Sequence, residues 1–388
     1  MHKEELSEKW NLVYVQGNRE IQDVANFLES EYGDKNIGLH WSSALLNWKV
    51  GDLNPAGHGL IFSAILNGRT VGSVSLTFKR LYSGGQKYLM AEIGDAYTSK
   101  SMLAKSSHKR YSCSSKYAGP FQNTEYINSS IFARLATEAI GWASTMGVQG
   151  IYGTPNALAL PGWIKRLDFK LVNTQTSRIR SRTLLTAKLF QLKKRVPSLV
   201  ARLFGYCLSF ASQLLLFFPT IKLAKFQIDE LKQLANSEFD DLWESSVSEG
   251  ASLVKNKDWL SWRYQSHPDI TYKIYTLRLK GHLCGWLVLR IRQSAEGPII
   301  TICDWLYRTD SALWVAFIYK VLQSLEYQNA VVRLWSCDNT LLVKDLWRLL
   351  ALGGAYVNVI FKPLVNGESV FNVEHIFDEF SIGHTDNV

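Results

Sequence analysis

The sequence predicts an α/β fold made of two similar domains, and three observations support this prediction. Its 388 residues exceed what one ordinary hydrophobic core spans, so two domains are expected. Apolar residues make up 47% of the chain and charged residues 20%, which is the composition of a folded protein and not of a disordered one. A set of short motifs also occurs twice in the same order, which indicates an internal repeat.

The repeat consists of four motifs. The first copies are Leu46-Asn-Trp-Lys49, Ile61 to Gly72, Ala91 to Asp95 and Gly150 to Asn156, and the second copies are Leu260-Ser-Trp-Arg263, Ile274 to Gly285, Ile300 to Asp304 and Ala330 to Asn339. Trp48 lies 20 residues before the turn glycine Gly68, and Trp262 lies 19 residues before Gly281. Because the two tryptophans occupy equivalent places, we expect them to share a packing role.

Local patterns predict the elements of each copy. Residues on either side of Gly68 and of Gly281 alternate between apolar and polar types around a glycine turn, which predicts two β-hairpins. The apolar runs at 88–93 and 298–302 predict a central strand in each copy.

The first copy continues with a helix, a strand and a second helix. Residues 131–146 place apolar side chains at helical spacing behind polar cap candidates. A strand is expected at 150–153 and a helix at 160–167. Residues 99–123 are rich in Ser, Lys and Tyr and have no counterpart in the second copy, so they predict an inserted loop.

The net charge of +9 comes from one segment. Residues 176–226 contain ten Lys or Arg and no Asp or Glu, which leaves 33 basic and 34 acidic residues in the rest of the chain. A nucleic-acid groove would spread its basic side chains over a folded face, so no nucleic-acid partner is expected. The predicted organisation is a first domain at 1–175, a basic and apolar linker at 176–226, and a second domain at 227–388.

The linker contains 19 uncharged residues from Leu203 to Ile221, flanked by basic residues. This length is close to the ~20 residues that cross a bilayer, but a single crossing would separate the two repeat halves. We therefore expect an element that lies on an anionic membrane surface. The alternative is an apolar element buried between the domains.

Several function classes are not indicated. The five cysteines are widely spaced and odd in number, so they predict buried thiols and neither a disulfide framework nor a zinc site. The first ten residues carry charges without an apolar run, which predicts a cytoplasmic protein, peripheral on the inner face of the membrane if the linker binds there. The eight histidines show no metal-ligand spacing, so no metal is expected.

The order of these elements resembles the GNAT N-acyltransferase superfamily. Gly153-Thr-Pro-Asn156 followed by Trp163 to Phe169 is similar to that family's Pro-Asn element and aromatic ending, with Asp168 where glycine is usual. The second half, with 239–243 and 260–264, resembles the companion half of tandem proteins encoded with bacterial surface-polysaccharide enzymes. The resemblance implies two GNAT-like domains, each a mixed, mainly antiparallel twisted sheet flanked by helices, the second one degenerate.

The resemblance also implies an acyl-CoA donor, with acetyl-CoA as the first expectation. Asn128, Ser129 and Ser130 stand where the family binds the coenzyme pyrophosphate, at the start of a helix whose unpaired N–H groups favour anions. Ile93 belongs to the strand whose backbone meets the thioester, and Asn156 is expected to orient the thioester or the pantetheine arm.

Asp95 and Glu92 are the candidates for taking a proton from an attacking amine. Three residues separate them, so they point to opposite faces of a regular strand unless a bulge intervenes. The alternative is that Asp95 caps a turn and Glu92 pairs with a base. Trp163 stands where relatives carry a proton-donating hydroxyl, so Tyr152 is the candidate general acid. His40, His58 and Trp163 are expected to line the acceptor site.

The leading hypothesis is N-acyl transfer to the amine of a nucleotide-linked or lipid-linked sugar in surface-polysaccharide biosynthesis. Two alternatives stay open. One is a non-catalytic adaptor that binds a glycan precursor at the membrane, because residues 127–132 lack the glycines of the family's phosphate loop. The other is a transferase that uses aminoacyl-tRNA. The oligomeric state is left open.

Overall fold

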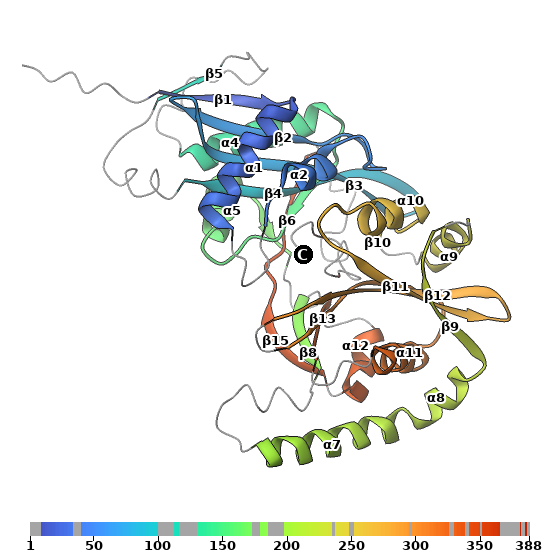
Figure 1. The fold of residues 1–388 in the computed structure, drawn as a ribbon. Helices are drawn as coiled ribbons and strands as arrows, with labels where there is room; N and C mark the ends of the chain where they lie inside the picture. The colour runs from blue at the N-terminus through green and yellow to red at the C-terminus, as the bar shows by residue number, and fades with distance from the viewer. Residues whose placement is uncertain are drawn as a thin grey trace, which may run out of the picture.

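The computed structural model describes most of the chain. The described residues are 9–33, 40–99, 112–115, 130–172, 179–184, 198–234, 237–247, 252–294, 297–325, 330–337, 341–349 and 351–364, with Ser381 and Thr385. They form two mixed sheets that lie one above the other, with helices between them and on their outer sides (Figure 1).

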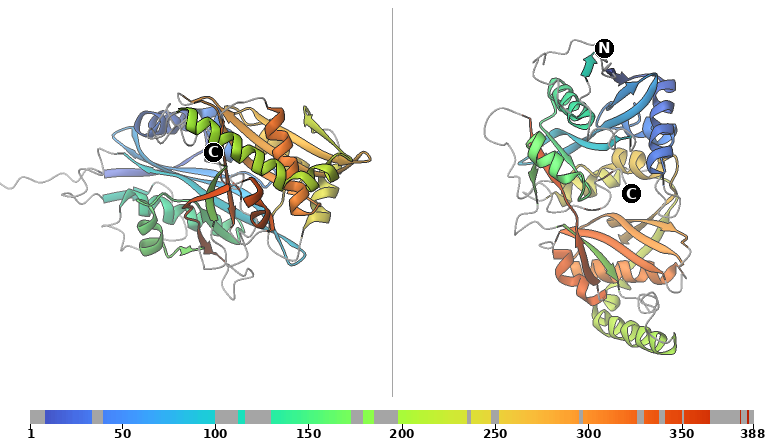
Figure 2. Two further views of the ribbon diagram at one scale, coloured as in Figure 1. Left: turned by 90° about the horizontal axis from the view of Figure 1, so that it is seen from below. Right: turned by 90° about the vertical axis from the view of Figure 1, so that its left-hand side faces the viewer.

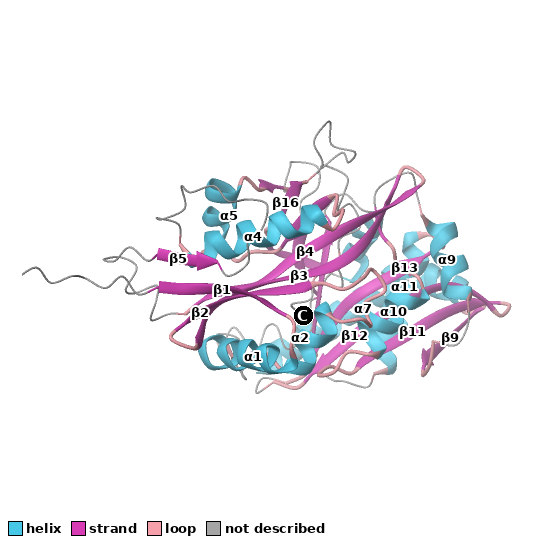
Figure 3. Cartoon of the chain, turned by 90° about the horizontal axis from the view of Figure 1, so that it is seen from above, coloured by secondary structure: helices cyan, strands magenta, loops and turns pink. Residues whose placement is uncertain are grey.

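The first sheet is mostly antiparallel. Its order is β5 (Ser112–Ser115), β1 (Lys9–Val15), β2 (Leu60–Leu66), β3 (Arg69–Ser83), β4 (Gln86–Thr98), β6 (Gly150–Gly153), β16 (Ile360–Pro363) and β7 (Lys170–Leu171), and β10 (Ser252–Leu253) also pairs with β3. Only the β1–β5 and β4–β6 pairs of this sheet are parallel. The long strands β3 and β4 run past β2 toward the second half (Figure 3).

The second sheet repeats this plan. Its order is β15 (Ala351–Tyr356), β8 (Ile179–Leu184), β14 (Val331–Cys337), β13 (Ile299–Tyr307), β12 (His282–Arg292), β11 (Tyr272–Leu279) and β9 (Phe226–Leu231). Its parallel pair is β13–β14. Both predicted hairpins are confirmed: β2–β3 turns at Asn67 and Gly68 and β11–β12 at Lys280 and Gly281, and all four residues have positive φ.

Helices cover both faces of each sheet. In the first half α1 (Asn18–Tyr32) and α2 (Ser43–Val50) pack on one face, and α4 (Ile131–Thr145) and α5 (Leu160–Leu167) pack on the other. In the second half α9 (Glu238–Ser246) and α10 (Lys257–Leu260) lie between the sheets, whereas α8 (Phe217–Leu223), α11 (Ser311–Ser324) and α12 (Leu341–Leu346) pack on the outer face. Helix α7 (Ser198–Leu215) precedes α8.

The sheets do not follow the predicted domain bounds. Strand β8, from the predicted linker, pairs with β14 and β15 of the second sheet. Strand β16, from the second half, pairs with β6 and β7 of the first, and β5, from the predicted insertion, pairs with β1. The chain before α7 therefore supplies a strand to the second sheet, and the second half supplies one to the first sheet. Both strands pair with edges that would otherwise be exposed.

The two halves meet at the predicted tryptophan pair. The rings of Trp48 and Trp262 are stacked with centroids 4.8 Å apart, and both residues are buried. The indole N–H of Trp48 donates to the carbonyl of Trp262 at 2.8 Å, and the indole N–H of Trp262 donates to the carbonyl of Trp48 at 3.1 Å. The expected packing role is confirmed, and the reciprocal contacts give this centre an approximate twofold symmetry.

Candidate active site

The first sheet opens between β4 and β6. The two strands pair in parallel from Met90 and Gly150 to Glu92 and Tyr152. Beyond that point β4 continues to Thr98, and no other strand of the described ranges pairs with this edge. Unpaired backbone groups at the carboxyl ends of diverging strands are a common place for a ligand.

Glycine keeps the opening narrow at its base. A Cβ atom on Gly153 would lie 2.9 Å from the carbonyl oxygen of Ile93, so only glycine lets β6 approach β4 this closely. The Ile93 side chain is buried in the core under α4. Its predicted part in coenzyme binding therefore involves the backbone alone.

A β-bulge shapes the next stretch of β4. Ser73 pairs with Tyr97 and Ser75 with Gly94, so Asp95 and its neighbour stand opposite one residue of β3. Asp95 has a φ of 45°, in the left-handed region that Asp tolerates better than most residues. Because of the bulge, Glu92 and Asp95 both point toward the face that α2 and the second half cover.

The Asp95 carboxylate is buried and fully engaged. It forms an ion pair with Lys49, with Nζ at 3.0 and 3.1 Å from the two oxygens. The indole N–H of Trp41 donates to it at 2.9 Å and the hydroxyl of Ser75 at 2.7 Å. Three side chains occupy the hydrogen-bonding positions of this carboxylate, so the contacts favour anchoring of the bulge. The role of Asp95 as a base stays a prediction.

Glu92 and Tyr152 face the core between the sheets. Glu92 pairs with Lys79 at 3.4 Å, and the Lys79 ammonium lies 5.0 Å from the ring centroids of Trp259 and Trp262. Tyr152 is packed in the same core and is 1% exposed. The alternative expected for Glu92, an ion pair with a basic residue, matches this geometry. Tyr152, the candidate general acid, has its side chain buried away from solvent.

An aromatic cluster follows the bulge, and sequence reasoning missed it. The ring centroid of Tyr97 lies 5.4 Å from that of Trp41 and 4.3 Å from that of Tyr32. Burial, and then the charge of Asp95, raises the pKa of Tyr97 to about 12. Tyr97 therefore stays neutral at physiological pH, and its ring packs against α1 and Trp41.

This pKa predicts an alkaline loss of stability. An unfolded tyrosine ionises near pH ~10, whereas folded Tyr97 keeps its proton to about 12. The folded state then binds more protons between these values, so the free energy of unfolding falls as pH rises through this window and is unaffected below it. Urea unfolding should show a shallower fall for Tyr97→Phe than for the exposed control Tyr206→Phe. An equal fall in both variants would contradict the assignment.

The start of α4 offers an anion site next to the opening. Ser130 is exposed and caps the helix, its Oγ accepting the N–H of Ala133 at 3.3 Å. Arg166 of α5 donates to the same Oγ at 3.1 Å, and the first turn of α4 holds no acidic residue. Helix N–H groups, the helix dipole and a guanidinium together favour a phosphate. Asn128 and Ser129 lie outside the described residues.

The equivalent helix of the second half has the opposite character. Asp310 caps α11 by accepting the N–H of Leu313 at 2.8 Å, and the hydroxyl of Ser311 donates to the carboxylate of Asp345. Two carboxylates at this helix start repel an anion. Of the two equivalent helix starts, that of α4 is the one suited to a phosphate.

In the second half, Asp304 occupies the place that corresponds to Asp95. Asp304 follows a register shift between β12 and β13 and is completely buried. It accepts hydrogen bonds from Lys255 at 2.7 Å, from Tyr264 at 2.9 Å and from Ser381 at 2.9 Å. Burial, and then Asp304, raises the pKa of Tyr264 well above its usual value. This centre is closed by the chain's own side chains.

Comparison with solved structures identifies the architecture. No family model and no curated protein matches the sequence. A GCN5-related N-acetyltransferase from Anabaena variabilis matches with a TM-score of 0.56 at 13% identity, over 91% of this chain and 73% of that chain. N-myristoyltransferase of Saccharomyces cerevisiae with bound myristoyl-CoA matches with a TM-score of 0.57 at 12% identity, over 92% and 84%. A probable N-acyltransferase from Enterococcus faecalis matches with 0.54 at 11%, over 92% and 72%.

The chain has an N-acyltransferase fold. The predicted fold class, mixed sheets flanked by helices, is confirmed. At these identities the comparisons establish the architecture, and the chemistry has to be argued from this chain's own residues.

Asn156 and Asp168, at the two ends of α5, have local structural roles. The Asn156 Oδ1 accepts the N–H groups of Leu158 at 3.1 Å and Ala159 at 2.9 Å, which caps the entry to α5. Asp168 ends α5 with a φ of 56°, in the left-handed region that favours glycine at the end of a helix. Asn156 is exposed, so its predicted coenzyme contact stays compatible with the cap.

Trp163 and the two histidines are not brought together by the N-acyltransferase fold. Trp163 is buried under α4, with its ring centroid 4.8 Å from that of Phe132. His40 lies before α2 and pairs with Glu29 at 2.9 Å, whereas His58 lies beyond the other end of α2 and pairs with Asp52 at 3.0 Å. A helix of eight residues, about 12 Å long, separates the histidines. No group of potential ligands suited to a metal occurs among the described residues.

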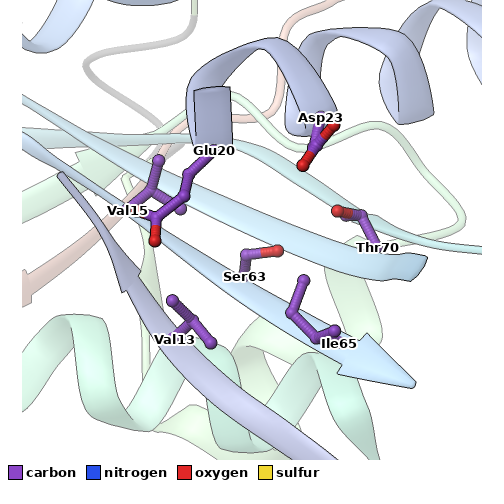
Figure 4. Close-up of a pocket in the computed structure, with 7 residues that line it drawn as sticks. All are labelled: Val13, Val15, Glu20, Asp23, Ser63, Ile65 and Thr70. Atoms are coloured by element: carbon purple, nitrogen blue, oxygen red, sulfur yellow. The ribbon is translucent and has the colours of Figure 1, made fainter. Parts of the chain in front are cut away.

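A shallow pocket of about 110 Å³ lies elsewhere, between α1 and the sheet (Figure 4). Its lining residues are Val13, Val15, Glu20, Asp23, Ser63, Ile65 and Thr70. The carboxylates of Glu20 and Asp23 point from α1 toward the strands, and none of the predicted site residues lines the pocket. It is smaller than the ~300 Å³ typical of ligand sites, so it does not suit a coenzyme.

Proposed function

We propose that this protein transfers an acyl group from an acyl-CoA to an amine at the opening between β4 and β6. The observation that supports this most is that no described strand pairs with the edge of β4 beyond Glu92, beside the acid-free start of α4. A pantetheine arm can pair with that edge, while the pyrophosphate takes the helix N–H groups and Arg166. The second half lacks this combination because Asp310 and Asp345 occupy its helix start.

The reaction would proceed by direct attack. The amine nitrogen bonds to the thioester carbon, the carbon–sulfur bond breaks, and coenzyme A leaves as its thiolate. Backbone N–H groups near the bulge would polarise the carbonyl, and the narrow base at Gly153 would keep the thioester in place. The amine proton passes to a base of the protein or to water.

Two side chains are candidates for that base. Asp95 lies at the bulge but is held by Lys49. His40 is about half exposed, and Glu29 orients its ring at 2.9 Å. Asp95→Asn and His40→Ala separate the roles: the variant of the true base loses turnover and keeps coenzyme affinity. Asp95→Asn is expected to lower thermal stability in either case, because Lys49 keeps its charge in the core. Asp95→Asn with lowered stability and retained turnover would assign the anchoring role instead.

Acetyl-CoA is the proposed first donor, and the proposed acceptor is the amine of a nucleotide-linked or lipid-linked sugar in surface-polysaccharide assembly. The acceptor rests on the resemblance of the second half to tandem proteins of that kind. Incubation with acetyl-CoA and a nucleotide-linked amino sugar should release free thiol and yield an amide detectable by mass spectrometry. Coenzyme binding without turnover on any amino sugar would reject this acceptor class.

The coenzyme site has its own test. Acetyl-CoA at about 100 times its dissociation constant should add about 2.7 kcal/mol to the free energy of unfolding, read as a raised thermal midpoint. Arg166→Ala should weaken the dissociation constant about tenfold or more, because it removes a charge-assisted hydrogen bond. Lys165→Ala is the matched control, because Lys165 is an exposed cation on the same helix, whereas the hydrogen bond to Ser130 comes from Arg166. An unchanged midpoint at millimolar ligand would favour a non-catalytic adaptor.

A further inference from the structure

Helices α7 and α8 lie on the outer side of the second sheet, away from the first sheet (Figures 1 and 2). One stripe along them is exposed and apolar, with spacings of three or four residues between successive turns. The stripe consists of Leu203, Tyr206, Phe210, Leu214, Phe217, Phe218 and Ile221, each more than half exposed. Scattered apolar residues are normal on a surface, but a continuous stripe of this kind marks a contact surface.

Helix α8 and the end of α7 are fixed to the protein on the side opposite the stripe. Leu216 and Leu223 are buried in the core of the second half, beside α11. The guanidinium of Arg348 donates to the carbonyl of Leu215 at 3.0 Å, where α7 ends. The end of α7 and the whole of α8 are therefore anchored to the second half, and the expected alternative of an element buried between the domains does not fit the exposed side chains.

The surroundings of the stripe are basic. Residues 176–226 contain no acidic residue, and Lys222 and Lys225 are exposed beside the last turn of α8. Two of the ten basic residues serve the second sheet instead: Arg182 is buried and donates to Ser336 at 2.8 Å, and Arg180 stacks on Tyr356 with its guanidinium carbon 4.4 Å from the ring centroid. The positive charge near the stripe complements an anionic surface.

We propose that the α7–α8 stripe binds an anionic lipid bilayer, with the two helices lying in the plane of the interface. Apolar side chains on one side and lysines at the edge are the features of an interfacial helix. None of the helices in the described ranges is long and apolar enough to cross a membrane. A second copy of the chain suits the stripe less well, because symmetric pairing would bring two acid-free basic segments together. The inference does not depend on acyl transfer.

Vesicle sedimentation tests the stripe. The protein should pellet with vesicles of phosphatidylcholine and phosphatidylglycerol, bind phosphatidylcholine alone at least about tenfold more weakly, and be released by high salt. Changing Tyr206, Phe210 and Phe218 together to serine should weaken binding to the mixed vesicles about tenfold or more. Leu53→Ser is the control, because Leu53 is 69% exposed and lies after α2, outside the stripe. All these side chains are exposed, so folding should persist, which circular dichroism checks.

Cys207 reports insertion directly. It is exposed between Tyr206 and Phe210, contrary to the sequence expectation that all the thiols are buried. With Cys113 and Cys284 changed to serine, a polarity-sensitive fluorophore on Cys207 should shift to the blue when mixed vesicles are added. The buried Cys303, whose pKa is raised to about 12 mainly by burial, should stay unlabelled in the native protein.

Three outcomes would overturn the proposal. Equal binding to both vesicle types would reject the anionic surface. Unchanged binding in the serine variant would reject the stripe. A dimer in sedimentation velocity that the serine variant abolishes, without vesicle binding by the parent protein, would assign the stripe to a second copy of the chain.

Discussion

Lys49→Met is expected to lower the free energy of unfolding by about 3–5 kcal/mol, because it leaves the Asp95 carboxylate buried without its cation. Lys49 and Asp95 are each 2% exposed as side chains, and their distance is 3.0 Å. Asp95 lies in the bulge of β4 with a φ of 45°. We expect its bonds to Lys49, Trp41 and Ser75 to stabilise this backbone conformation. Chemical unfolding followed by tryptophan fluorescence measures the loss.

Two further variants sharpen this prediction. Lys49→Met combined with Asp95→Asn should recover much of the loss, because no charge stays buried and an asparagine still accepts hydrogen bonds at a positive φ. Lys362→Met is the control: Lys362 lies 3.6 Å from Asp168, which is 95% exposed, and a surface pair of this kind contributes about 0–1 kcal/mol. If Lys49→Met and Lys362→Met destabilise equally, the buried pair does not anchor the bulge.

Phe361→Ala should destabilise the protein by about 3–5 kcal/mol through the cavity that it leaves. Phe361 lies on β16, comes from the second half of the sequence and is completely buried beside β6 of the first sheet. Phe218→Ala is the matched control, because Phe218 is 75% exposed and its loss should change stability by less than about 0.5 kcal/mol.

The same variant tests the strand exchange. Because β16 belongs to the first sheet and β8 to the second, neither half is complete without the other, and both should unfold in one transition. Midpoints from circular dichroism and tryptophan fluorescence should coincide in the parent protein and move together in Phe361→Ala. Two separate transitions, with only one shifted, would show that each half folds independently.

Local pattern predicted much of the fold and part of the candidate site. The strand at 150–153 and the helix at 160–167 have the predicted bounds, and the helix predicted at 131–146 ends one residue earlier. Strand β4 extends beyond the predicted end at Ile93, because Asp95, which could have capped a turn, forms a bulge with Ala96 within the strand.

The sequence by itself determined the hairpin turns and the helix starts, which depend on neighbouring residues. It also determined the repeat, and with it the equivalent places of Trp48 and Trp262, because each copy can be compared with the other along the chain. Periodicity and turn chemistry act over a few residues, so they can be read without the fold. Only the tertiary structure decided which residues meet across the chain. The pairing of Lys49 with Asp95, the contact of Arg166 with Ser130 and the exchange of β8 and β16 join segments 36 to more than 150 residues apart. Many basic residues could form an ion pair with the same carboxylate, and many strands could pair with the same sheet edge. The packing of the whole chain selects one of them.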